Sequence, residues 1–181
     1  MLLGSDAIKQ ALESGEIVCN PKPTVIEATH IDLHLGEYYY TLANGAGRYV
    51  VNLNSADPDE EYTLFRGNVY IPAHGFVLAH TLEYAGTTTP DLVPFIETRS
   101  TMARWGITAH ISAGWGDPGF CGRWTLEIAN HRSSEVMIPT GSRICSIGFH
   151  VVSSNNMMYE GRYNAPENWK PELMLPRKGN L

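Results

Sequence analysis

The sequence predicts a single domain that is mainly β, a distorted barrel or jelly roll with one short helix near its N-terminus. Its 181 residues include 17 glycines and 11 prolines, which indicate many turns. Short apolar runs with strand-like alternation recur along the chain. Apolar residues make up 43% and aromatic residues 10%, which is typical of a globular protein and enough for one core at this length.

The predicted helix begins near Ser5, which is placed to cap it, and ends at Gly15. Its apolar face consists of Ile8, Ala11 and Leu12. The following run, CNPKP at 19–23, is predicted to be a loop with an extended bias, because a proline restricts the residue before it.

The first predicted strand covers residues 29–36, where Ile31, Leu33 and Leu35 face inward. A further strand runs through the three tyrosines at 38–40 towards a turn at Asn44-Gly45. An acidic surface loop at 57–61 follows. The next predicted strands are 69–71, 76–79 and 92–96, the last after a loop at 87–90.

The polar face of the first strand carries His30, Asp32 and His34, two residues apart. This spacing is compatible with a metal site on a strand, but a solvated polar face has the same pattern. We therefore predict no metal there.

The second half of the chain begins with a glycine-rich turn region at 113–120 and a strand at 124–128. Trp124, Leu126 and Ile128 face one side of that strand, and Thr125 and Glu127 face the other. A turn at 131–134, a strand at 136–138, a turn at 139–141 and a core strand at 144–149 follow. From about residue 155 the chain becomes polar and irregular, and we expect a mobile C-terminal tail.

The charge and cysteine content exclude several classes of protein. Lys and Arg number 13 against 19 Asp and Glu, giving a net charge of −6, which argues against a nucleic-acid or membrane-surface partner. The three cysteines, Cys19, Cys121 and Cys145, form no C-x-x-C pair, which favours a reduced, cytoplasmic compartment. No signal-peptide pattern and no apolar stretch of membrane-spanning length is present.

The stretch from Glu97 to Asn130 concentrates the residues suited to chemistry. Ser100 and Arg104 are four apart and share a face of a helical turn, flanked by Arg99 and Thr101. Guanidinium groups beside hydroxyls suit a phosphate or a polar base edge, although a surface helix with solvated arginines has the same composition. Asp117 on the glycine-rich turn and Glu127 on the strand add two acids, whose alternative role is that of solvated charges.

These motifs resemble the dCTP deaminase branch of the trimeric dUTPase-like family. RSTMARWG at 99–106 is similar to its R-S-S-x-A-R-x-G box, and AGWGDPGFCG at 113–122 to its A-G-x-x-D-x-G-aromatic-x-G hairpin. TLE at 125–127 matches the T-L-E that carries the deaminase glutamate, a position that is apolar in plain dUTPases. A weaker likeness covers the A-T-x-D-x-x-L-G segment ending at Gly36 and the tail. Glu127 therefore favours deamination.

The resemblance implies a dUTPase-type barrel that forms a homotrimer with active sites between neighbouring subunits. It implies that the chain deaminates dCTP to dUTP and ammonia in pyrimidine deoxynucleotide metabolism and binds dCTP, dUTP or dTTP. Glu127 would move protons, while Ser100 and Arg104 orient water and stabilise charge. The implied substrate-binding residues are Arg99, Ser100, Thr101, Met102, Ala103, Arg104, Ala113, Asp117, Thr125, Leu126, Glu127, Tyr159 and Arg162.

The expected cofactor is Mg²⁺ bound with the triphosphate, and no zinc is expected. Zinc deaminases carry H-x-E and P-C-x-x-C signatures, and both are absent from this sequence. The tail run YEGR at 159–162 resembles the family's K-Y-x-G-Q motif, with Met158 in place of the lysine and Arg162 in place of the glutamine. Its implied role is to close over the triphosphate.

Three further alternatives for the function remain open. The run Ala113-Gly114-Trp115 resembles deaminases that also hydrolyse dUTP to dUMP and pyrophosphate, and Asp117 stands where the family's dUTPases place an acid near the attacking water. A dUTP diphosphatase without deaminase activity and a non-catalytic nucleotide-binding trimer are the other candidates. The presence of Ser100, Arg104, Asp117 and Glu127 together argues against a non-catalytic role.

Overall fold

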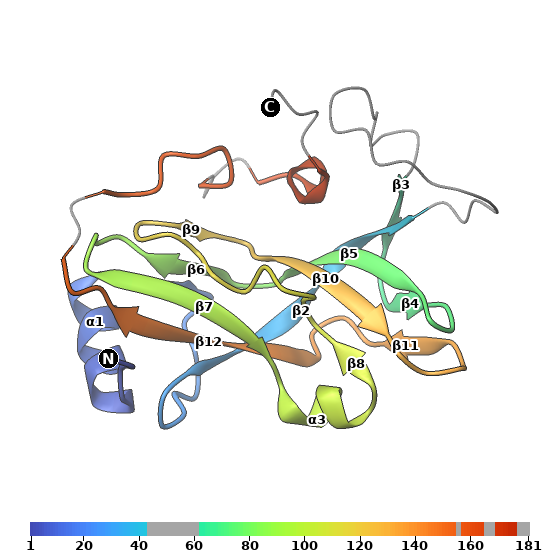
Figure 1. The fold of residues 1–181 in the computed structure, drawn as a ribbon, viewed down its shortest axis with the longest axis horizontal. Helices are drawn as coiled ribbons and strands as arrows, with labels where there is room; N and C mark the ends of the chain where they lie inside the picture. Colours follow the sequence, from blue (N-terminus) through green and yellow to red (C-terminus); the bar gives the residue numbers. More distant parts are fainter. Residues whose placement is uncertain (43–61, 155–156, 165–168, 177–181) are drawn as a thin grey trace.

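The computed structural model describes residues 1–42, 62–154, 157–164 and 169–176. In this part of the chain strands dominate and form a nearly closed, barrel-like sheet, with a short helix against one end (Figure 1). The mainly β prediction is confirmed. The predicted turn at 44–45 and the acidic loop at 57–61 lie outside the described residues.

Helix α1 (Ser5–Ser14) follows the predicted pattern except at its start. Gly4 is the N-cap instead of Ser5, because the Gly4 carbonyl accepts the first helical hydrogen bond from the Ile8 N–H at 3.0 Å. Gly15 ends the helix with φ 83°, a left-handed conformation that glycine adopts without strain. Ile8 and Ala11 are buried, and Leu12 packs beside them.

The strands of the described residues form three antiparallel sheets. The largest has the order β7-β12-β2-β5-β10-β8, with β3 paired to β2; the other two are β1-β6-β9 and β11-β4. The strands are β1 (Ile17–Asn20), β2 (Ile31–Leu42), β3 (Tyr62–Arg66), β4 (Val69–Ile71), β5 (Phe76–Thr81), β6 (Tyr84–Thr87), β7 (Leu92–Thr98), β8 (Ile107–Thr108), β9 (Cys121–Gly122), β10 (Thr125–Asn130), β11 (Val136–Ile138) and β12 (Arg143–Val151). The described part of the chain also contains two short helices, α3 (Ser100–Arg104) and η1 (Pro171–Met174).

The loop predicted at 19–23 is wrong at its start, because Cys19 and Asn20 belong to β1. This strand pairs along its length with β6, from Ile17 opposite Thr87 to Asn20 opposite Tyr84. The partner lies more than sixty residues away in the sequence, so the local pattern carries no sign of it. The same pairing places Thr87, predicted in a loop, at the end of β6.

Strand β2 joins the two halves of the largest sheet. Its first residues pair with β12, and from Leu35 onward it pairs with β5, with a register shift between Leu35 and Tyr39. Gly36 sits at this shift, where a Cβ atom would run into the imidazole ring of His80. A residue without a side chain is therefore required where the strand changes partner.

The core fills the interior of the barrel. Ile31, Leu33 and Leu35 are buried as predicted, and Leu126 and Ile128 of β10 are fully buried. A second, smaller cluster lies on another face, where Tyr40 and Leu78 pack with tail residues; its buried members are Tyr40, Leu78, Met174 and Leu175.

All three cysteines are buried and free. Burial raises the pKa of Cys19 to about 12 and that of Cys121 to about 11, and it also raises the pKa of Cys145. Among the described residues, no helix is long and apolar enough to span a membrane.

Candidate active site

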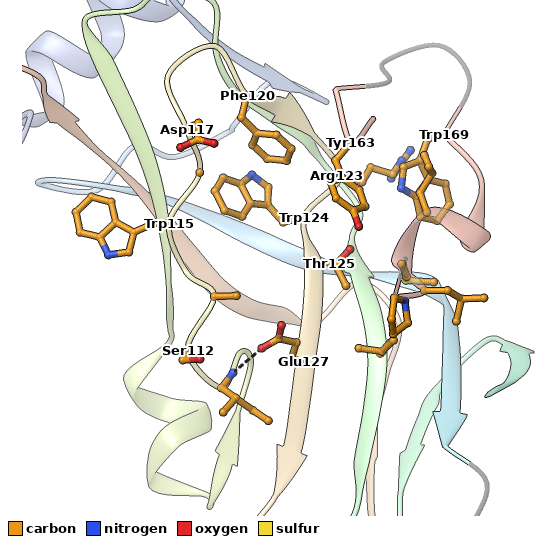
Figure 2. A pocket seen from close by; sticks show the side chains of 18 of the residues that line it. Ser112, Trp115, Asp117, Phe120, Arg123, Trp124, Thr125, Glu127, Tyr163 and Trp169 are labelled. Carbon is orange, nitrogen blue, oxygen red and sulfur yellow. Dashed lines mark hydrogen bonds between the residues drawn. The ribbon is translucent and has the colours of Figure 1, made fainter. Parts of the chain in front are cut away.

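A cavity of about 740 Å³ lies beside β10 and β5, and residues of the described part of the tail line one side of it (Figure 2). Five of the residues predicted from the sequence to bind substrate line it. They are Ala113, Asp117, Thr125, Glu127 and Tyr159. The strand, the hairpin and the tail, which are separated in the sequence, therefore meet around one space.

Strand alternation directs Glu127 into this cavity. Its neighbours Leu126 and Ile128 point into the core, so Thr125 and Glu127 share the opposite face of β10. The Ile111 N–H donates a hydrogen bond to Glu127 Oε2 at 3.2 Å, shown by the dashed line in Figure 2. This contact holds Glu127 Oε2 against the backbone of the segment that leads into Ala113.

The glycine-rich segment that presents Asp117 is tied to the edge of β7. The Ile96 N–H donates to the Gly114 carbonyl at 2.7 Å, and the Gly116 N–H donates to the Pro94 carbonyl at 2.9 Å. A turn then follows, in which the Phe120 N–H donates to the Asp117 carbonyl at 2.9 Å. Asp117 is exposed, and Figure 2 shows it at the other end of the site from Glu127.

The arginine box forms the predicted helical turn, α3. Arg104 donates to Ser100 Oγ at 3.2 Å, which confirms that the two residues share a face. None of residues 99–104 lines the cavity that contains Glu127. Within one chain, the predicted catalytic residues thus fall into two separate groups.

Asp32 organises the polar face of β2 near the box. Its carboxylate is mostly buried and lies 3.1 Å from Arg99 Nε and 3.2 Å from Arg143 Nη1. Ser146 Oγ also donates to it, at 3.0 Å. His34, on the same face, contacts Glu83, with 2.5 Å between His34 Nδ1 and Glu83 Oε1. Among the described residues, no group of three or more His, Cys, Asp or Glu side chains is placed to hold a metal ion.

The tail contributes Tyr159 to the cavity but not Arg162. The Tyr159 N–H donates to the Pro118 carbonyl at 2.7 Å, and its ring packs edge-on against Phe120. Arg162 instead donates to the Leu175 carbonyl at 3.4 Å, with its guanidinium 4.9 Å from the Tyr163 ring centroid. The side chain of Leu126, also predicted to bind substrate, is buried in the core.

Among the cavity residues that were not identified from the sequence, Arg123 and Trp169 contact each other. Arg123 donates to the carbonyls of Thr81 and Leu82 and lies 5.5 Å from the centroid of the Trp169 ring. A charged residue just before the T-L-E run was the available signal for Arg123. Trp169 stands in the irregular tail, where no periodicity indicates which way a side chain points.

Comparison with protein families and curated relatives gives a consistent result. A family model described as dCTP deaminase-like matches residues 2–152. A dUMP-forming dCTP deaminase of Coprothermobacter proteolyticus is 32% identical over 178 residues, covering 92% of each chain. One from Methanobrevibacter smithii is 34% identical over 159 residues, covering 84% of this chain and 81% of the relative. A dCTP deaminase of Thermomicrobium roseum is 35% identical over 165 residues, covering 87% and 83%.

A solved structure shares the fold. The 2′-deoxycytidine 5′-triphosphate deaminase of Agrobacterium tumefaciens superposes with a TM-score of 0.59 at 16% sequence identity. The match covers 83% of this chain and 48% of that one. At this identity the likeness shows the architecture alone.

Proposed function

Since the chain belongs to the dCTP deaminase-like family, we propose that it hydrolyses dCTP to dUTP and ammonia. The observation that carries this proposal is the half-buried carboxylate of Glu127, held by the Ile111 N–H at the wall of a cavity large enough for a nucleotide. The curated relatives over most of the chain are named dCTP deaminases, which supports the same substrate.

In the proposed reaction Glu127 moves the protons. Its carboxylate takes a proton from water as the water oxygen adds to C4 of cytosine, and it gives that proton to N3. It then transfers the second proton, from the new C4 hydroxyl, to the amino group. The C4–N bond breaks, ammonia leaves and a C4 carbonyl remains, so dCTP and water yield dUTP and ammonia. No zinc enters this route.

We propose that Ser100 and Arg104 reach this site from a neighbouring subunit. They lie together on α3, outside the cavity of their own chain, yet they match the box of the family motif. A homotrimer with shared sites would unite the two groups, with Arg104 stabilising charge that develops on the ring. The remaining box residues, Arg99, Thr101, Met102 and Ala103, would then border the substrate.

Mg²⁺ belongs to the substrate in this proposal. It would bridge phosphate oxygens of the bound triphosphate, as it does in many nucleotide enzymes, and needs no dedicated set of protein ligands. We place the protein in the cytoplasm, where its buried free cysteines and its nucleotide substrates fit.

A second activity, hydrolysis of dUTP to dUMP and pyrophosphate, is favoured by the position of Asp117. This acid lines the same cavity as Glu127, and relatives over most of the chain are named dUMP-forming. Asp117 would activate water for attack on the triphosphate while the uracil ring stays bound.

One assay tests both activities. The purified protein is incubated with dCTP and Mg²⁺, and the products are separated with time. Release of ammonia and a uracil nucleotide is expected. Accumulation of dUTP alone would exclude the second activity, whereas dUMP with pyrophosphate would support it. If dUTP is hydrolysed but dCTP is untouched, the protein is a dUTP diphosphatase and the deaminase proposal fails.

A further inference from the structure

The indole of Trp169 packs against aromatic side chains of the largest sheet. Its ring centroid lies 4.3 Å from that of His80 and 6.4 Å from that of Tyr38. The Arg123 guanidinium lies 5.5 Å from the same ring. Both rings are tilted by 44° to the indole, and tilted aromatic contacts and a nearby cation each stabilise its position. Trp169 is therefore an anchor for the tail.

Hydrogen bonds hold the His80 ring in place. His80 is 3% exposed, with Nδ1 2.8 Å from the Thr81 carbonyl and Nε2 3.3 Å from the Tyr38 N–H. A neutral imidazole that donates from Nδ1 and accepts at Nε2 satisfies both contacts, and burial lowers the pKa of His80 to about 4. The His80 ring is thus uncharged at neutral pH and can pack against the Trp169 indole, beside Arg123, without repulsion.

The chain after Trp169 packs against the strand next to Glu127. Met174 and Leu175 are buried against Leu78 and Tyr40. Leu78 is the cross-strand partner of Glu127, so the Cβ atoms of these two residues are about 5 Å apart on one face of the sheet. The anchored segment therefore borders the cavity at the end where the proposed chemistry occurs.

The side chains that this segment gives to the cavity are all apolar: Trp169, Leu173, Met174, Leu175 and Pro176. Lys170 does not line the cavity, and neither does Arg162. A phosphate chain is bound mainly by charged groups, and none of these five side chains is charged. The C5–C6 edge of a pyrimidine carries no hydrogen-bonding group and suits such a wall.

We infer that residues 169–176, anchored by Trp169, form the wall against which the pyrimidine base packs, instead of a clamp on the triphosphate. This inference rests on the proposed function, because Glu127 must face C4 of the cytosine. Trp169 is then a positioning residue, which acts through Leu173, Met174 and Leu175. The triphosphate, at the far end of the nucleotide, would make its contacts with other parts of the site.

The test removes the anchor and varies the length of the phosphate chain. Trp169→Ala is expected to raise the KM for dCTP by roughly tenfold or more, because the base loses its wall. The inhibition constants of dCDP and dCMP, measured against dCTP, should rise by the same factor. Trp169→Phe should keep most of the affinity. A triphosphate clamp would give the opposite pattern, with dCTP weakened and dCMP unchanged, and would overturn the inference, as would unchanged constants for all three nucleotides.

A second variant reports on the base directly. Leu175→Ala shortens a side chain of the wall and so enlarges the cavity, while Trp169 stays in place. It should therefore raise kcat/KM for 5-methyl-dCTP relative to that for dCTP. An unchanged ratio would contradict a base-side wall, and this variant carries the test if Trp169→Ala does not fold. Tyr70→Ala, at an exposed aromatic position on β4, is the matched control and should change none of these constants.

The proposed function and the inference fail in different ways. A wild-type protein that does not deaminate dCTP would reject the proposed function itself. A deaminase in which Trp169→Ala weakens dCTP but leaves dCMP unchanged would reject only the inference.

Discussion

Arg99 and Asp32 form an ion pair in which Arg99 Nε lies 3.1 Å from the Asp32 carboxylate. Asp32 stands on β2, and Arg99 is the N-cap of α3, directly after β7. The pair therefore fixes the point at which the chain leaves the sheet and begins the arginine box. Arg143 and Ser146 contact the same carboxylate, and His30 Nε2 lies 3.8 Å from it.

Replacing Asp32 with Asn should lower the free energy of unfolding by roughly 2 kcal/mol, because two guanidinium groups lose the charge of their shared partner. Urea denaturation followed by circular dichroism measures this change. Asp6→Asn, at an exposed position on α1, is the control and should cost well under about 1 kcal/mol. Equal losses in the two variants would show that the Asp32 cluster does not hold the box.

Glu127→Gln should reduce the deamination rate by at least about 100-fold, because the amide cannot accept the proton from water. The amide oxygen can still accept the Ile111 N–H, so the thermal unfolding midpoint should stay near that of the wild type. Ammonia release from dCTP gives the rate. Glu13→Gln on the exposed side of α1 should leave it unchanged. A folded Glu127→Gln protein with normal turnover would remove this residue from the mechanism.

Mixing two inactive variants tests whether sites are shared between subunits. Arg104→Ala and Glu127→Gln damage different halves of the proposed site, so each homotrimer should be inactive. Co-refolding equal amounts should restore activity, because random assembly makes about a quarter of the sites intact in both halves. Two copies of one variant refolded together provide the control. If the mixture stays as inactive as its parents while hetero-oligomers are present, both groups act within one subunit.

Because His80 is buried, the free energy of unfolding should decrease as the pH is lowered. Its pKa is about 4 in the folded chain against 6.5 for an ordinary histidine, so between these values the unfolded chain binds a proton that the folded chain does not. Stability is therefore full above pH 6.5 and decreases towards pH 4, with a loss from this group of roughly 2 kcal/mol between pH 7 and pH 5. The measurement is urea denaturation at both pH values. His80→Gln should show a smaller decrease; an equal decrease would assign the effect to other groups.

The sequence alone predicts the strands in which apolar and polar residues alternate strongly. The strands predicted at 29–36, 92–96, 124–128 and 144–149 correspond to β2, β7, β10 and β12, and all four lie in the largest sheet. The sequence alone does not predict β1, β3 or β6, because these strands depend on pairing with strands that are distant in the sequence. A strand of four or five residues is stabilised by its partner, and a local pattern does not contain the partner.

The same limit applies to the site. Spacing placed Ser100 and Arg104 on one helical face, and alternation placed Glu127 opposite Leu126. Neither pattern shows that α3 lies outside the cavity of its own chain. Trp169 was missed because its place is set by the rings of His80 and Tyr38, which come from two other strands.

The three buried thiols make the protein a convenient background for site-specific labelling. Each has a pKa far above neutrality, so a maleimide dye at pH 7 should leave them untouched while the chain is folded. A single cysteine introduced at exposed Glu160 would then carry the only fluorophore, and its emission would follow the tail in real time as nucleotide is added.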